Sequence, residues 1–426
     1  MQGELKKIDG DTALKFDYYE LPNGLKVVLS EDHTIPSVAI NVCYHVGSKN
    51  EKPDKRGYAH LFEHLMFEGS KHLKAGEYDR ISVFAGGENN AYTTEDKTNY
   101  YLLLPSNQLE LGLWLESDRL LGCAVTKKSL EIQKGVITEE KNQNCDNRPY
   151  GTVNIEFAPK LYKNSGYSWD TIGDMAEVQN ANMDDIREFY YSYYIPNNTV
   201  LSICGDINIA ETKELVEKYF GEISKGKDVV RPEFNELPLN GESRKIIYDD
   251  IQFPGIFIGY RIPGEFTKES VSLEILSEIL AGGESSKLYR ELVYEKQLSN
   301  EIASYVDNKE STGVFYIYSV LMPDVETGEV EKIIDRIIDD TGKGMISDKE
   351  IEKAKNRIET KLTYKKQSIL YKADLFAHFT CFYGNPGMIN EILKVYLSVS
   401  KDDIIRTVNT YLNMQNRVIL TYLPKQ

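Results

Sequence analysis

The sequence predicts an α+β fold made of two homologous domains, each a mainly antiparallel sheet packed with helices. An internal repeat is the first observation behind this prediction. DDIREFYYSYYIPNNTVLSICGD, which starts at Asp184, aligns without a gap with DDIIRTVNTYLNMQNRVILTYLP, which starts at Asp402, at an offset of 402 − 184 = 218 residues. Each copy has the pattern of a helix opened by acidic residues, followed by a turn and an apolar strand. The offset is about half of the 426 residues, which indicates a duplication.

The beginnings of the two halves are the second observation. Both GLKVVLSEDHTIPSVAINVCYHVGS and RKIIYDDIQFPGIFIGYRIP have the pattern of a strand, a short polar link and a second strand. Between the halves, residues 224–243 are rich in Pro, Gly and charge, as extended linkers are. We therefore place the first domain at residues 1–223 and the second at residues 244–426. Duplicated domains usually face each other across a cleft, so we expect one half of a clam-shell.

Within each half, strands rich in Val, Ile and Tyr alternate with segments of helical periodicity. The clearest helical segments are residues 109–121, 210–220 and 269–280. Long helices against an antiparallel sheet are the architecture that this alternation indicates.

The composition excludes several classes of function. The net charge of −16 and the pI near 5.0 disfavour nucleic acid and anionic membrane surfaces as partners, because both would repel the chain. No apolar run approaches the roughly 18 residues that a membrane-spanning helix needs. The N-terminal MQGELKKIDGDTALKFDYYE has no signal-peptide core. We expect a cytoplasmic protein, or one whose leader has been removed.

The stretch HLFEH, residues 60–64, contains the residues most suited to bind a metal and to catalyse a reaction. On a helix, His60, Glu63 and His64 share one face, because residues three and four apart are neighbours. Two imidazoles four residues apart can grip one zinc ion, and zinc makes a water molecule acidic enough for a neighbouring Glu to take its proton. A solvated helix surface is the alternative interpretation. The apolar residues that would pack the other sides of this helix argue against it.

The pattern H-x-x-E-H is the inverted form of the zincin signature. With its flanking blocks, the chain resembles the inverzincin peptidases of the pitrilysin, insulin-degrading enzyme and mitochondrial processing peptidase family. It is most similar to catalytic subunits of the bacterial two-component members. The blocks that carry the resemblance, in family order, are LPNGLKVVLSEDH, YHVGSKNEKPDKRGYAHLFEHLMFEGS, PSNQLELGLWLESDRL, DNRPYG and GGESSKLYRELVYEKQLS.

The resemblance implies one zinc ion per chain, with Glu63 as the catalytic base and His60 and His64 as ligands. The family's third ligand is a Glu some seventy residues further on, and GVITEEKNQ offers both Glu139 and Glu140 there. Pairing Val136 and Ile137 with the family's apolar residues favours Glu140, at 140 − 64 = 76 residues after His64. Adjacent helical residues point about 100° apart, so only one of them can reach the ion.

Residues near these ligands are expected to tune them. Many relatives carry an acidic residue seven positions before the third ligand, where this chain has Gln133. Gln133 and Glu139 are therefore candidates for supporting contacts to the ligands.

The resemblance also implies how a peptide is held. In GGENNAYTTEDKTNYY, residues 86–101, Asn90 and Ala91 match a pair that lies on an edge strand beside the metal in the family. A peptide added there as a further strand is held through its backbone, which suits varied sequences. An ordinary exposed strand is the alternative.

A second subunit is expected because residues that the family uses are missing from the second half of this chain. Many relatives supply an Arg and a Tyr from the second domain, but this chain has Val293 and Asn300 at those positions. SLEILSEIL likewise replaces the metal-binding helix in the second half. We therefore predict a heterodimer with a homologous zinc-free subunit that carries the pair, or otherwise a homodimer.

The expected function is a zinc endopeptidase or oligopeptidase that hydrolyses unfolded peptides in an enclosed chamber. A non-catalytic assembly or peptide-binding subunit of the same fold is the alternative. The bacterial relatives with export signals favour the periplasm or cell envelope after removal of a leader, with the cytoplasm as the alternative.

Overall fold

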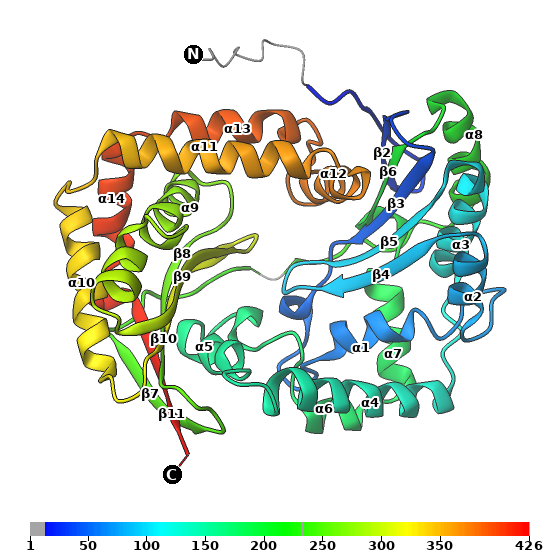
Figure 1. The fold of residues 1–426 in the computed structure, drawn as a ribbon. Coiled ribbons are helices and arrows are strands. Elements are labelled where there is room, and N and C mark those ends of the chain that lie inside the picture. Colours follow the sequence, from blue (N-terminus) through cyan, green and yellow to red (C-terminus); the bar gives the residue numbers. More distant parts are fainter. Residues whose placement is uncertain (1–12, 232, 426) are drawn as a thin grey trace.

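The computed structural model describes residues 13–231 and 233–425, which form two sheets on opposite sides of the molecule, each accompanied by helices (Figure 1). The strands of the first sheet, in spatial order, are β1 (Asp17–Glu20), β2 (Lys26–Glu31), β6 (Thr199–Gly205), β3 (Ser37–Tyr44), β5 (Thr98–Pro105) and β4 (Glu88–Thr93). Those of the second sheet are β7 (Ser243–Asp249), β11 (Arg417–Pro424), β8 (Gly255–Pro263), β10 (Thr312–Leu321) and β9 (Ser299–Asn308).

Helices accompany both sheets. Those of the first half are α1 (Tyr58–Leu65), α2 (Glu77–Phe84), α3 (Leu109–Leu121), α4 (Lys127–Lys141), α5 (Val153–Leu161), α6 (Met175–Asn180), α7 (Met183–Tyr193) and α8 (Ile209–Phe220). Those of the second half are α9 (Lys268–Ala281), α10 (Thr327–Gly342), α11 (Asp348–Lys365), α12 (Ile369–Tyr383), α13 (Met388–Ser398) and α14 (Lys401–Tyr411). The three helices expected from periodicity correspond to α3, α8 and α9. Among the described residues, none of the helices combines the length and apolar character that crossing a membrane requires.

The predicted duplication is visible in the topology, and the α+β fold class is confirmed. Helices α7 and α14 begin at residues 183 and 401, and strands β6 and β11 begin at residues 199 and 417, so both pairs keep the offset of 218. In each sheet a single pairing is parallel, β2 with β6 and β7 with β11, and every other pairing is antiparallel. The two halves therefore share one strand order, with one additional edge strand in the first.

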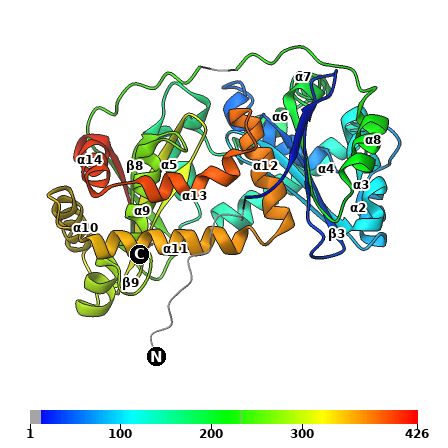
Figure 2. The same cartoon turned by 90° about the horizontal axis from the view of Figure 1, so that it is seen from above.

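The halves exchange one helix each, which the sequence did not predict. Helix α5, from the first half, packs against β8 and β11, and helix α12, from the second half, packs against β3 and β6 (Figures 1 and 2). Phe157 and Leu161 of α5 are buried in one cluster with Leu420 of β11. Ala377 of α12 is buried beside Cys43 of β3. Because each sheet is covered by a helix from the other half, the two halves cannot separate without exposing both cores.

A buried ionic cluster joins the halves at the tips of two hairpins, the β4–β5 hairpin and the β9–β10 hairpin. Lys309 Nζ lies 2.6 Å from Glu95 Oε1, and Lys49 Nζ lies 2.6 Å from Asp96 Oδ1 and also contacts Glu310. The backbone N–H of Glu310 donates to Asp96 Oδ2 at 2.9 Å. Both lysines are less than a tenth exposed. Buried ions need such partners, so this cluster fixes the two hairpins relative to each other.

Acid is expected to weaken this cluster. Burial raises the pKa of Glu310, but the hydrogen bonds and charges of His45 and Lys49 outweigh it and bring the pKa to about 2. A carboxylate whose pKa is lowered on folding stabilises the protein fully above its unfolded pKa, and this contribution is lost as the pH falls from about 4.5 to about 2. In urea unfolding, the stability difference between wild type and Glu310→Gln should therefore shrink over that range. The exposed Glu284→Gln variant is the control, and a pH-independent Glu310 difference would contradict the prediction.

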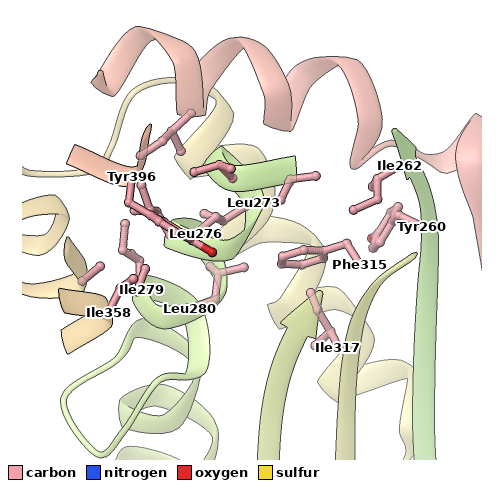
Figure 3. Packing of buried hydrophobic residues seen from close by; sticks show 14 of the residues in the cluster. Tyr260, Ile262, Leu273, Leu276, Ile279, Leu280, Phe315, Ile317, Ile358 and Tyr396 are labelled. Carbon is pink, nitrogen blue, oxygen red and sulfur yellow. The ribbon is translucent and has the colours of Figure 1, made fainter. Parts of the chain in front are cut away.

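The second half has an apolar core at the position where the first half has its polar helix face. Leu273, Leu276 and Leu280 of α9 are fully or almost fully buried, and Figure 3 shows them packed together with Phe315 and Ile317 of β10. In the part of the chain that the structure describes, the only group of three or more potential metal-ligating side chains is His60, His64 and Glu140 in the first half. The candidate metal site therefore lies in the first half.

Candidate metal centre and active site

Helix α1 has its polar residues on one face and buries its apolar residues on the other. It begins after Gly57, whose φ of 93° is in the left-handed region that favours glycine. Leu61, Phe62 and Leu65 are completely buried, whereas His60, Glu63 and His64 are only partly buried. Helical periodicity thus gives one apolar side, which packs on the sheet and α7, and one polar side.

Helix α4 brings the distant carboxylate to this polar side. Thr126 accepts a hydrogen bond from the N–H of Ser129 at the start of the helix, which fixes where its first turn lies. Fourteen residues after Thr126 (140 − 126 = 14), the carboxylate of Glu140 meets the two histidine rings of α1. Its Oε2 lies 3.3 Å from His64 Nε2 and 3.7 Å from His60 Nε2, and the two Nε2 atoms are 3.3 Å apart.

These distances fit a zinc ion. Ligand atoms about 2.0–2.2 Å from an ion in tetrahedral geometry lie about 3.3–3.6 Å from one another, close to the three separations observed. Two imidazole nitrogens and one carboxylate oxygen are also the donor set of one class of catalytic zinc site. The residues present therefore fit the metal that the resemblance implies.

The electrostatics of His60 and Glu140 favour metal binding, whereas without a metal His64 is paired with the carboxylate of Glu140. Burial, followed by the neighbouring His64, lowers the pKa of His60 to about 4, so His60 is a neutral imidazole at neutral pH. The hydrogen bond with His64 lowers the pKa of Glu140 despite the opposing effect of burial. For His64, burial lowers the pKa, but Glu140 outweighs burial and the net shift is upward. Neutral imidazole and ionised carboxylate are the forms that bind metals.

Glu139 and Gln133 differ in their relation to this cluster. Glu139 is exposed and accepts from Gln143 Nε2 at 2.9 Å, so the prediction that it supports the ligands finds no contact in the structure. It lies about 100° around α4 from Glu140, which explains why it points away. Gln133 lies two turns before Glu140, close enough to His64 to contribute to its raised pKa. Its Nε2 donates to Glu68 Oε1 at 2.6 Å.

Glu63 is held by a residue that the sequence analysis missed. The hydroxyl of Thr93, at the end of β4, lies 2.5 Å from Glu63 Oε2. Burial is the main cause that raises the pKa of Glu63, while Thr93 and His64 oppose the rise. A carboxylate with a raised pKa beside a metal site is suited to accept and return a proton near neutral pH. Strand periodicity could have indicated Thr93, which is two residues after Ala91 and so on the same face of β4.

Asn90 and Ala91 lie on β4, which is an edge strand of the first sheet, as expected. Asn90 is exposed, and its Oδ1 accepts from the N–H of Ala91 at 2.8 Å. An edge strand offers unpaired backbone groups to an added strand. A peptide that pairs with Ala91 would have to displace the Asn90 side chain from this N–H.

The positions of the missing Arg and Tyr lie in the second half. Val293 is in the π-helical segment η6 (Tyr289–Glu295) and packs partly buried against the core, whereas Asn300 is exposed on β9. Val293 has no hydrogen-bond donor in its side chain, and Asn300 offers a neutral amide donor in place of the phenol of a Tyr.

The remaining histidines pair with carboxylates outside the cluster. His45 binds Glu310 at 2.9 Å, and His378 binds Glu265 at 2.9 Å. The other two pairs, both near the surface, are His33 with Asp206 and His72 with Asp118. His45 and His378 are thus held in partly buried pairs within the fold, whereas His33 and His72 lie at the surface.

The two-domain architecture is that of known peptidases. The crystal structure of a protease from Helicobacter pylori matches this fold with a TM-score of 0.92 and 28% identity, covering 97% of this chain and 100% of that one. The zinc protease PqqE of the same species is 29% identical over 93% of this chain and 90% of its own length. The periplasmic protease PqqL of Escherichia coli matches with a TM-score of 0.77 and 19% identity, covering 96% of this chain but 48% of that one.

The chain belongs to peptidase family M16, the insulinase-like peptidases. The model described as insulinase, peptidase family M16, matches residues 26–160, which include α1 and α4. The model described as the M16 inactive domain matches residues 180–358. The predicted family resemblance is confirmed.

Proposed function

We propose that this chain is a zinc-dependent endopeptidase or oligopeptidase that hydrolyses unfolded peptides and holds one zinc ion per chain. The observation that carries the proposal is the convergence of His60, His64 and Glu140 from two helices, with Glu63 beside them on α1. A lone pair of histidines would be compatible with a structural role. Three donors at tetrahedral separations next to an independent carboxylate favour catalysis.

Each residue has a definite role in this proposal. A bound zinc ion supplies the Lewis acidity that makes a water molecule acidic and polarises a peptide carbonyl. Glu63 accepts the proton of the attacking water and returns it to the leaving amine. Thr93 orients Glu63 through the 2.5 Å hydrogen bond. Asn90 and Ala91 on β4 hold the peptide backbone as an added strand, so the strand that binds the substrate also positions the base.

We further propose that catalysis requires a second subunit that completes an enclosed chamber. Val293 and Asn300 leave the second half without the Arg and Tyr that would bind substrate or the oxyanion. The fold of this chain corresponds to 48% of the length of the Escherichia coli protease PqqL, which is consistent with a functional unit about twice this size. The partner is a homologous zinc-free chain, with a second copy as the alternative. A periplasmic or envelope location is part of the same proposal, and the cytoplasm is its alternative.

The test is cleavage of a quenched fluorescent peptide library by the purified chain, alone and with candidate homologous subunits. Cleavage should be abolished by a zinc chelator, restored by added zinc and strengthened by the partner. Full activity that survives dilution of the chain alone would overturn the heterodimer proposal. Zinc binding without cleavage under every combination would instead favour a non-catalytic assembly or peptide-binding subunit.

A further inference from the structure

The first turn of α1 has no cap of its own. The first N–H groups of a helix have no partner within it and need an acceptor, which the side chain before the helix usually provides. Here that position is Gly57, which has no side chain. A Cβ added to Gly57 would lie 2.8 Å from Val178 Cγ2 and 2.9 Å from the carbonyl oxygen of Ile172. The tight contact excludes an ordinary capping residue, so the cap must come from elsewhere.

Glu51, six residues before Gly57, provides the missing acceptor. Its Oε2 accepts the N–H of Gly57 at 3.0 Å, and its Oε1 accepts the N–H of Ala59 at 2.7 Å. A third donor, the indole Nε1 of Trp169, lies 2.9 Å from Oε2. Glu51 is 8% exposed. Three donors around one buried carboxyl suit a carboxylate, and the N-terminus of a helix also favours negative charge.

The position of Glu51 does not depend on the metal. Glu51 follows the short 3-10 turn Ser48–Asn50, and Trp169 also donates to the carbonyl oxygen of Ser48 at 3.2 Å. Lys49 in this turn belongs to the ionic cluster that joins the two halves. The carboxylate is thus fixed from the scaffold on one side of α1, and it grips the residue immediately before His60.

We propose that Glu51 is a positioning residue for the metal centre: by binding the N–H groups of Gly57 and Ala59 it fixes the rotation and height of the first turn of α1, and so the direction in which His60 points. The proposal rests on the proposed zinc-dependent function. A helix whose first turn frays or rotates would still fold against the sheet through Leu61, Phe62 and Leu65. It would, however, present His60 away from Glu140.

A cavity next to Glu51 allows its positioning role to be tested by adding a small carboxylate that replaces the missing side chain. It measures about 450 Å³, and Glu51, Trp169, Arg56 and Phe234 are among its lining residues. In a Glu51→Ala variant the atoms removed correspond to acetate, which the cavity can admit from solvent. Acetate can accept all three hydrogen bonds, whereas acetamide of the same size has one acceptor atom and brings an NH₂ group that confronts the donors.

The experiment measures zinc affinity by competition with a chromophoric chelator, without peptide, for wild type, Glu51→Ala and Glu51→Gln. Burial raises the pKa of Glu51 to about 8, so the measurements are made at pH 8.5. We expect zinc binding about tenfold weaker in both variants, in line with the 10–100-fold cost of removing groups that orient ligands. Acetate should restore most of the affinity of Glu51→Ala, and acetamide should not. Glu51→Gln, which keeps the volume, serves if Glu51→Ala does not fold.

Glu177→Ala is the matched control. Glu177 is another carboxylate of the same region, but it binds the side chain and backbone N–H of Arg56 instead of α1. Acetate should have no effect on its zinc affinity. Unchanged affinity in both Glu51 variants, or equal rescue by acetate and acetamide, would overturn the positioning role.

The two proposals fail in different ways. Zinc affinity is measured without substrate, so a wild-type chain that binds zinc but cleaves nothing refutes the peptidase and leaves the role of Glu51 to be decided by the affinities. A wild-type chain that binds no zinc refutes both. Where cleavage is measurable, Glu51→Gln should lower kcat and leave KM unchanged, because β4 is untouched.

Discussion

Glu63→Gln should lower peptide cleavage by about 10²–10⁴-fold, the range that general acid–base groups contribute, while the protein keeps its zinc. An amide cannot accept the proton of the attacking water, yet it preserves the size of the side chain and can still accept from Thr93. His60, His64 and Glu140 keep their positions, because Glu63 is not part of their cluster. Single-turnover cleavage together with the zinc content of the same sample provides the measurement.

The pH dependence of the wild-type rate gives the control for this assignment. Cleavage requires ionised Glu63, and burial raises the pKa of Glu63 above 4.5. The rate should therefore fall on the acid side at a pH above the ordinary range of a glutamate. If Glu63→Gln retained wild-type activity, or lost its zinc together with the activity, Glu63 would not be the base.

Glu140→Gln should abolish tight zinc binding, and Glu139→Gln should leave it unchanged. Removing a direct ligand is expected to weaken affinity by more than about 100-fold, since even groups that only orient ligands are worth about 10–100-fold. The two variants make the same chemical change at adjacent positions of α4, so they share any general effect on the helix. Chelator competition and metal analysis measure both.

The same two variants also test the rotation of α4 about its axis, which decides whether Glu140 or Glu139 faces the histidines. Glu140 lies 3.3 Å from His64, whereas Glu139 is exposed and accepts from Gln143. Loss of zinc in Glu139→Gln with retention in Glu140→Gln would mean that α4 is rotated by one residue in the metal-bound protein.

The sequence predicted the fold class well because duplication and periodicity are local properties. The offset of 218 residues reappears in α7 and α14 and in β6 and β11. The exchange of α5 and α12 between the halves could not be predicted in the same way. An amphipathic pattern shows that a helix buries one side, but it does not show which of two equally apolar sheets receives it.

The residues of the candidate site likewise include some that the sequence predicted and some that it did not. Spacings of three and four residues placed His60, Glu63 and His64 on one side of one helix, because helical geometry depends on local dihedrals alone. Thr93 and Glu51 were missed, since each acts through a contact with α1 from a separate segment. Strand periodicity puts Thr93 on the same face of β4 as Ala91, but no local pattern shows that its partner is Glu63, and none marks Glu51 in its loop.

By itself, therefore, the sequence determined the repeat, the secondary structure around it and the residue types that suit a metal. The tertiary structure decided which carboxylate of α4 meets the histidines, which groups hold Glu63 and the first turn of α1, and which helix covers which sheet. The physical reason is that backbone periodicity is set by neighbours along the chain. The approach of two side chains from distant segments is set by how the elements pack against one another, which no local pattern encodes.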